Sequence, residues 1–229
     1  MSIVIKIGGA LLEKPKDAAA AIARAVTEPS VVVHGGGLQI SRMLERMSIE
    51  SRFVDGLRVT DAAALDAVCQ ALLGEVHAKL VQLLQTAGVP AVGIVGGIRA
   101  RKKEGPWGFV GSNLEADPEL LRALLALGRV PVIPTLAADV NGLLNVNGDE
   151  TAAAVAVSVR ARRLIFMTDV PGVKDASGAV ISTATSVDDL LTAKFVSGGM
   201  VPKLRAVKSA LSGGVPTVHV GQTLFEGVS

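Results

Sequence analysis

Short apolar runs rich in β-branched residues alternate along the chain with longer stretches rich in Ala and Leu. Runs of a few nearly all-apolar residues are typical of strands buried on both faces of a sheet. The predicted strands are 3–7, 31–34, 90–95, 130–134, 164–168 and 216–220. The predicted helices are 17–27, 38–47, 62–87, 118–127, 149–160 and 201–213. This alternation predicts an α/β fold with a mainly parallel central sheet and helices on both faces.

Three stretches depart from that alternation. Residues 51–60 predict a short β-ribbon around an Asp-Gly turn, and residues 137–145 predict a hairpin around an Asn-Gly turn. Residues 98–111 are basic and then rich in Gly and Pro, which is typical of an exposed hairpin or flap. The character of the motifs changes near residue 145. We therefore expect an N-terminal lobe over 1–145 and a C-terminal lobe over 146–229, joined by one continuous sheet.

Composition narrows the classes of protein that the chain can represent. Its 229 residues are 49% hydrophobic and carry a net charge of +2, so no general attraction to nucleic acid or to an anionic membrane is expected. Only 3% of the residues are aromatic, which argues against a surface that stacks bases. The single Cys excludes an intrachain disulfide, and the three scattered His predict no metal site.

The first apolar run is too short and too charged for a secretion signal, and no apolar run approaches the length of a membrane span. We expect a soluble cytoplasmic protein.

Two glycine-rich loops follow the first two predicted strands. Residues 8–9 are both Gly, and residues 35–37 are three Gly that open a helix. Open α/β sheets bind ligands outside the carboxyl ends of their strands, and glycine lets backbone N–H groups approach a phosphate closely. Each loop alone could be a tight turn, but the pair favours a cradle for one phosphoryl group. Neither loop matches the GxxxxGK[ST] or the GxGxxG pattern.

Two lysines give a more specific signal. Lys6 ends an apolar strand directly before the first glycines, where burying an unpaired ammonium is costly unless a phosphate supplies its partner. Lys203 lies in the first turn of a predicted helix, where the helix dipole disfavours a cation. A solvated lysine is the alternative for Lys203. Together the two positions favour an anion bound between the lysines.

Polar residues next to other predicted elements are further candidates. Asn145 and Asn147 could hold a polar substrate, while Asp149 could pair with the lysines or simply cap the helix that follows. Arg58 could form a bidentate pair with a substrate carboxylate, or lie on the surface. Asp169 could contact a ribose, help to place Mg²⁺ through water, or form a simple turn.

Six segments, in order and spread over nearly the whole chain, resemble the amino-acid kinase family, and most closely its N-acetylglutamate branch. They are KIGG at 6–9, HGGG at 34–37, GLRVTD at 56–61, NVNGD at 145–149, TDVPGV at 168–173 and GGMVPK at 198–203. One such segment would mean little, whereas six in this order are highly specific. The resemblance implies a three-layer αβα sandwich with an N-terminal substrate lobe and a C-terminal nucleotide lobe.

The resemblance also implies roles for single residues. Lys6 and Lys203 would stabilise the transferring phosphoryl group and the leaving ADP, and Asp149 would orient both lysines. The phosphoryl-binding residues would be Gly8, Gly9, Gly36 and Gly37. The substrate-binding residues would be Gly35, Gly36, Arg58, Asn145 and Asn147. The nucleotide-binding residues would be Thr168, Asp169, Gly172, Val173, Met200 and Lys203.

The reaction that this resemblance implies is transfer of the γ-phosphoryl group of ATP to the side-chain carboxylate of N-acetyl-L-glutamate, in arginine biosynthesis. A carboxylate is already ionised at neutral pH, so no general base is needed, and His34 is expected to pack or hydrogen-bond within its loop. Phosphoryl transfer depends on positioning and electrostatic stabilisation. Mg²⁺ is expected to be held mainly by the phosphates of ATP.

The chain departs from the family pattern in places. Gly148 stands where the family usually has Ala, the sequence stops at Ser229 without the usual closing strand, and no long helix precedes Lys6. Family members with that helix resemble one another in forming hexameric rings inhibited by arginine, so a homodimer is expected here.

Two alternatives stay open at this point. One is a sister kinase of lysine biosynthesis, which acts on aminoadipate or glutamate attached to an acidic carrier protein. The basic residues within 99–103 could dock such a carrier, although a solvated hairpin tip also explains those residues. The other is a non-catalytic amino-acid or nucleotide sensor on the same fold. A sensor need not retain Lys6, Asp149 and Lys203 together.

Overall fold

The main sheet has eight strands and runs through both halves of the chain, as a computed structural model of residues 2–227 shows. In spatial order its strands are β12 (Thr183–Ala184), β14 (Thr223–Glu226), β13 (Thr217–Val220), β11 (Arg163–Met167), β1 (Ile3–Ile7), β2 (Ser30–His34), β8 (Val130–Pro134) and β5 (Ala91–Gly93). All neighbouring strands are parallel except β13 and β14. The predicted mainly parallel sheet is confirmed; the short strands β12 and β14 are additions that the sequence pattern did not predict.

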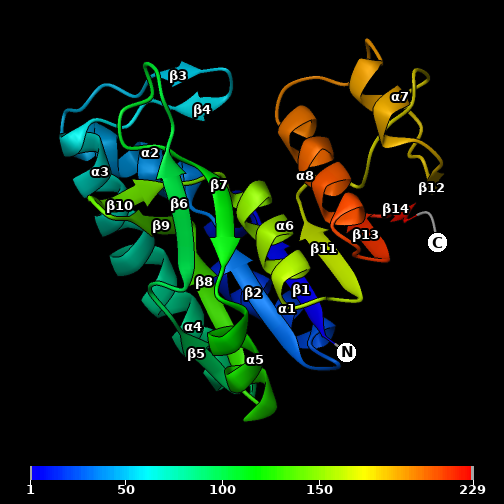
Figure 1. The fold of residues 1–229 in the computed structure, drawn as a ribbon, viewed down its shortest axis with the longest axis horizontal. Helices are drawn as coiled ribbons and strands as arrows, with labels where there is room; N and C mark the ends of the chain where they lie inside the picture. Colours follow the sequence, from blue (N-terminus) through cyan, green and yellow to red (C-terminus); the bar gives the residue numbers. More distant parts are fainter. Residues whose placement is uncertain (1, 228–229) are drawn as a thin grey trace.

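Helices cover both faces of this sheet, which confirms the three-layer αβα arrangement (Figure 1). They are α1 (Pro15–Ala25), α2 (Gly37–Arg46), α3 (Ala62–Cys69), α4 (Ala78–Thr86), α5 (Pro118–Ala126), α6 (Gly148–Ser158), α7 (Val187–Thr192) and α8 (Met200–Ser212), with the 3₁₀ turn η1 (Leu11–Glu13) and the π-helical segment η2 (Gln70–His77). Helices α6 and α8 lie side by side on one face, and α1 and α4 cover the other. No helix within residues 2–227 combines the length and the apolar character needed to cross a membrane.

The alternation of side chains along β1 decides which residues meet which helices. Ile3, Ile5 and Ile7 belong to the apolar cluster under α1 and α4, whereas Val4 belongs to the cluster under α6 and α8. Successive side chains of a strand point to opposite faces, so Lys6 shares the face of Val4. The single cation of β1 is therefore directed towards the layer that contains α6.

A second sheet of four strands is built from residues 98–145. In spatial order its strands are β10 (Gly142–Asn145), β9 (Leu136–Asp139), β6 (Ile98–Lys102) and β7 (Gly111–Ala116). The antiparallel pairs β9–β10 and β6–β7 confirm the two predicted hairpins. Strand β6 also pairs with β9, so the basic hairpin is part of a sheet rather than an isolated flap.

A short antiparallel ribbon, β3 (Phe53–Val54) and β4 (Leu57–Arg58), confirms the prediction for residues 51–60. Its turn has positive φ at both Asp55 (50°) and Gly56 (78°), as a type I′ turn requires. The Trp107 indole N–H donates to the carbonyl of Val54 at 3.2 Å. This bond joins the ribbon to the loop between β6 and β7.

Candidate active site

The carboxyl ends of β1, β2 and β11 meet at one edge of the main sheet. Strand β1 lies between the other two, so the chain moves to one side of β1 to form β2 and later returns to its other side to form β11. Open α/β sheets bind ligands at such a change of direction. The fold thus brings together the loops that begin at residues 8, 35 and 168.

A buried cluster of two lysines and one aspartate lies beside these loops. Lys6 Nζ is 2.7 Å from Asp149 Oδ1, and Lys203 Nζ donates to both carboxylate oxygens of Asp149 at 3.1 Å. The exposed fractions of Lys6, Asp149 and Lys203 are only 9%, 7% and 8%. Two positive charges share one negative charge, and no other ion pair among the described residues involves this cluster. The site therefore has a surplus positive charge in a poorly solvated place.

The surroundings keep Asp149 ionised. Burial acts to raise the pKa of Asp149, but the two lysines together outweigh burial and hold the pKa below its ordinary value. Burial lowers the pKa of Lys203, and the Asp149 carboxylate offsets part of that effect. A bound anion would stabilise the charged form of Lys203 further.

Asn147, rather than Asp149, caps α6. Its Oδ1 accepts from the backbone N–H groups of Asp149 at 2.8 Å and Glu150 at 3.1 Å. The alternative in which Asp149 serves only as the cap is therefore wrong. Because Asn147 satisfies the helix start, the carboxylate of Asp149 is left to the lysines. Within residues 2–227 only the oxygen of the Asn147 amide is engaged, which leaves its nitrogen available.

The two glycine loops contact each other so closely that no side chain would fit between them. A Cβ atom on Gly9 would stand 2.9 Å from the backbone nitrogen of Gly37, and one on Gly36 would stand 2.8 Å from the side chain of Leu72. The contact at Gly9 is with backbone, so that position requires glycine, whereas a Cβ atom on Gly36 would require the Leu72 side chain to shift. The contact places the two loops around one small volume.

Some backbone N–H groups of the two glycine loops donate hydrogen bonds within the protein, and others do not. Those of Gly8 and Gly35 donate to carbonyls of the sheet. Among the described residues the Gly9 N–H has no hydrogen-bond acceptor. Gly36 and Gly37 stand at the start of α2, where N–H groups have no partner within the helix. The free donors are thus the ones that an anion could use.

Lys6 borders a cavity of about 280 Å³ that contains every predicted substrate-binding residue. These residues are Gly35, Gly36, Arg58, Asn145 and Asn147. Phe53, Thr135 and Gly148 also line the cavity, although the sequence did not single them out as ligand-binding residues. They come from separate elements, so no local pattern could have indicated them.

Arg58 is a buried cation without an acidic partner. Its exposed fraction is 8%, and its guanidinium donates to the carbonyl of Gly37 at 3.2 Å and to Ser41 Oγ at 2.9 Å. The guanidinium carbon lies 4.6 Å from the centre of the Phe53 ring. None of the ion pairs found within residues 2–227 includes Arg58, so the surface alternative is wrong. A ligand carboxylate would supply the missing counter-charge.

Thr60 connects two of the predicted residues. Asn145 Nδ2 donates to Thr60 Oγ1 at 3.1 Å, and that hydroxyl donates to the carbonyl of Arg58 at 2.8 Å. Thr60 is fully buried. It therefore fixes the relative position of Arg58 and Asn145, a role that the sequence analysis missed.

Lys203 borders a second cavity, of about 410 Å³, which shares Gly9 with the first. Thr168, Asp169 and Met200 also line it. Among the predicted nucleotide-binding residues, Gly172 and Val173 do not. Their nucleotide contacts stay predictions, whereas the structure gives them packing roles.

Gly172 and Val173 instead hold the loop after β11 against β14. A Cβ atom on Gly172 would stand 2.7 Å from Thr223 Oγ1, and the Val173 N–H donates to that same hydroxyl at 2.9 Å. Val173 itself is buried in the core.

The donor set fits a cation carried by the ligand better than a resident metal. The described residues contain no group of three or more His, Cys, Asp and Glu side chains that could hold a metal ion. Asp149 is engaged by the two lysines, which leaves Asp169 as a carboxylate on the wall of the second cavity. Mg²⁺ prefers to keep waters and phosphate oxygens as ligands, with one or two carboxylates.

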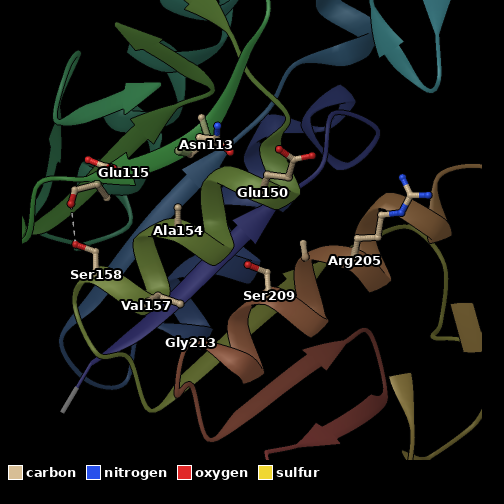
Figure 2. A pocket seen from close by; sticks show the side chains of 12 residues that line it. Asn113, Glu115, Glu150, Ala154, Val157, Ser158, Arg205, Ser209 and Gly213 are labelled. Atoms are coloured by element: carbon tan, nitrogen blue, oxygen red, sulfur yellow. Dashed lines mark hydrogen bonds between the residues drawn. The ribbon is translucent and has the colours of Figure 1, made fainter. Parts of the chain in front are cut away.

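A larger hollow, of about 780 Å³, lies elsewhere, between β7, α6 and α8. Figure 2 shows Glu150 and Ser209 along it and Arg205 extending from α8. Small residues such as Ala154 and Gly213 line much of it, and its charged side chains are exposed. Because convergent buried charges mark a candidate for chemistry, the lysine–aspartate cluster is the candidate active site instead.

Comparisons with known proteins show what the chain is similar to. Residues 1–222 match the sequence model of the Amino acid kinase family. An acetylglutamate kinase from Acidobacterium capsulatum is 42% identical over 235 aligned positions, which cover 96% of this chain and 90% of the relative. The crystal structure of smu.665 from Streptococcus mutans UA159 is similar with a TM-score of 0.88 at 29% identity, over 99% of each chain. A Giardia carbamate kinase has the same fold, with a TM-score of 0.71 at 12% identity over 99% of each chain.

Proposed function

Because the chain belongs to the amino acid kinase family, we propose that it transfers the γ-phosphoryl group of ATP to the side-chain carboxylate of N-acetyl-L-glutamate, in arginine biosynthesis. The observation that carries this proposal is the buried cluster of Lys6, Asp149 and Lys203, whose surplus positive charge lies between two cavities. Relatives that match over nearly the whole chain are named acetylglutamate kinase.

We assign the cavity beside Lys6 to the amino-acid substrate. Arg58 would pair with a carboxylate of the substrate, because it is buried and lacks a counter-ion in the protein. The amides of Asn145 and Asn147 would hold the remaining polar groups. Phosphoryl acceptance needs no catalytic base, because the attacking carboxylate is ionised at neutral pH.

We assign the cavity beside Lys203 to ATP. Thr168, Asp169 and Met200 line it, and Gly9 belongs to both cavities. The transferring phosphoryl group would then lie at the shared wall, within reach of the free N–H groups of the glycine loops. Mg²⁺, bound mainly to the phosphates, would neutralise part of their charge.

The two lysines would act as an electrostatic clamp. Lys6 would face the phosphoryl group from the substrate cavity, and Lys203 would face it and the leaving ADP from the other. Asp149 would keep both ammonium groups in place before ATP binds, so little reorganisation accompanies the reaction. The charge that develops on the phosphoryl oxygens would meet a preformed positive site.

Three finer expectations stay predictions. The two lobes, the homodimer and the cytoplasmic location belong to this group, and light scattering in solution would check the homodimer. The names of the relatives favour neither the carrier-protein alternative nor the sensor.

An ATP-consumption assay with three acceptors tests the proposal. We expect turnover with free N-acetylglutamate, and little with free glutamate or with a carrier-bound aminoadipate. Turnover only with the carrier-bound acceptor would contradict the choice of substrate. Tight binding of N-acetylglutamate and ATP without any turnover would indicate the sensor.

A further inference from the structure

Two histidines form a buried pair behind the second glycine loop. His34 Nε2 lies 2.9 Å from His77 Nδ1, and the ring centres are 5.2 Å apart. His34 is fully buried and His77 has an exposed fraction of 8%. His34 Nδ1 lies 3.0 Å from the carbonyl oxygen of Gly35, the residue that begins the loop. A chain of hydrogen bonds therefore runs from η2 through His34 to the loop.

The partners fix the direction of each hydrogen bond. A carbonyl oxygen can only accept, so His34 Nδ1 carries the proton that is donated to Gly35. His34 is neutral at pH 7, because burial lowers its pKa to about 4. Its Nε2 must then accept, and His77 donates from Nδ1. His77 thus selects the tautomer of His34 that fastens Gly35.

The π-helical winding of η2 places His77 where it can do this. The wider turn of a helix with i→i+5 hydrogen bonds places residues five positions apart closer to one face than an α-helix does. Leu72 and His77 are five positions apart; Leu72 lies near Gly36, and His77 contacts His34, the residue before the loop. A Cβ atom on Gly36 would stand 2.8 Å from Leu72 and 3.4 Å from Val76. Gly93 makes room for the ring, since a Cβ atom there would lie 2.6 Å from His77 Nε2.

We propose that His77 is a positioning residue for phosphoryl transfer, which acts through His34 to hold the N–H groups of residues 35–37 in their working orientation. This inference rests on the proposed function, and it deepens that function by adding a residue that touches neither predicted substrate. Leu72 and Val76 pack against the loop from the same helix, but apolar contacts do not fix the orientation of its N–H groups. The histidine pair supplies direction, because a hydrogen bond constrains both distance and angle.

Two variants distinguish the effect of the hydrogen bond on kcat from the effect of side-chain packing. His77→Leu removes the donor and leaves His34 Nε2 unpaired, whereas His77→Asn keeps an N–H group near the position of Nδ1. We expect kcat to fall about ten- to hundredfold in the Leu variant, because small misplacements of reacting groups reduce kcat by such factors. In the Asn variant kcat should stay within about threefold, and KM for both substrates should change little in either variant.

His219→Leu is a matched control, because His219 is a partly buried histidine of β13 that lines neither cavity. Its kcat should equal that of the wild type when all variants are assayed well below their unfolding midpoints. A kcat of His77→Leu that matches the wild type, or one that Asn fails to restore, would overturn the proposal. If the Leu variant does not fold, His77→Gln provides the comparison, because its amide lies one bond farther from the backbone than that of Asn. Equal kcat for the Gln and Asn variants would then overturn the proposal.

A spectroscopic measurement tests the pair without any substrate. In protein labelled with ¹⁵N-histidine at pH 7.5, long-range ¹H–¹⁵N spectra should show both His34 and His77 protonated at Nδ1. Protonation of His34 at Nε2 would overturn the tautomer argument. Absence of wild-type turnover with N-acetylglutamate would count against the proposed function instead, and this spectrum would still be informative.

Discussion

Lys203 stands in the first turn of α8, where the helix dipole disfavours a cation. The structure supplies the reason, since its ammonium donates to both oxygens of Asp149 and lies 5.1 Å from the centre of the Phe166 ring. Asp149 also binds Lys6. One carboxylate therefore holds two cations that would otherwise repel each other, and its loss should be worse for folding than the loss of either lysine.

Replacing Lys203 by Met tests the role of the surplus charge. Lys203→Met leaves Asp149 paired with Lys6, so the folded state should lose no more than about 1–2 kcal/mol. The phosphoryl group would lose one of its two cations, and kcat should fall about 10²–10³-fold. Steady-state kinetics and urea unfolding measure the two effects. An unchanged kcat would remove Lys203 from the catalytic role.

Asp149→Asn is the matched change at the acidic partner of Lys203. It leaves two buried ammonium groups without a counter-ion, so unfolding free energy should fall by about 3–5 kcal/mol. A smaller loss than in Lys203→Met would contradict the view that Asp149 holds the cluster together.

His34 makes stability depend on pH over a definite range. Burial lowers its pKa from the ordinary 6.5 to about 4 in the folded protein. Between these values the unfolded chain binds more protons than the folded one, so stability is full above pH 6.5 and is lost as the pH falls towards 4. The loss attributable to His34 is about 3 kcal/mol.

Urea unfolding at several pH values between 7 and 4 measures this effect. The wild type should show a steeper fall than His34→Gln, which cannot titrate. Equal slopes for the two proteins would show that His34 is not the group responsible. Asp149 titrates mainly below this range, because its pKa is lowered from the ordinary 3.8.

At the scale of elements, the helix 62–86 illustrates a limit of pattern reasoning. Its existence was predicted, but its middle part, η2, is wound as a π-helix. Leu72 lies near Gly36, while His77, five positions farther on, contacts His34. The segment packs against α2, α3 and β8, and its apolar pattern alone does not reveal the π-helical winding.

The contact between the two glycine loops makes a prediction at this scale. Gly9→Ala would bring a methyl group within 2.9 Å of the Gly37 backbone, so the loops must separate. We expect kcat to fall at least tenfold because the phosphoryl cradle widens. Gly74→Ala is the control, since open space surrounds a Cβ atom there and Ala should stabilise the helix by about 0.5–1 kcal/mol. Normal activity of Gly9→Ala would contradict the cradle.

At the scale of the whole molecule, the main sheet presents two cavities on either side of the lysine–aspartate cluster. The first is enclosed by the ribbon β3–β4, α2 and β10, and the second by the loops before α8 and after β11. The two walls come from residues far apart in the chain. Their separation predicts that substrate and nucleotide affinities can be changed independently.

Arg58→Lys tests that independence. Lysine keeps the charge but not the planar fork that binds a carboxylate at two points. We expect KM for N-acetylglutamate to rise about 10–100-fold, while KM for ATP changes less than about threefold. A rise confined to KM for ATP would show that the assignment of the two cavities is reversed.

The sequence by itself determined the order and type of most elements, because strand and helix periodicities are local properties of the chain. It also indicated Lys6 and Lys203, since a cation before glycines and a cation at a helix start conflict with local rules, and the family resemblance added Asp149. The tertiary structure decided everything that depends on residues meeting across the fold. It assigned the cap of α6 to Asn147, which left Asp149 to bind both lysines. It also brought His77 to His34 from 43 residues away. Those contacts depend on how helices pack on the sheet, and no short stretch of sequence encodes that packing.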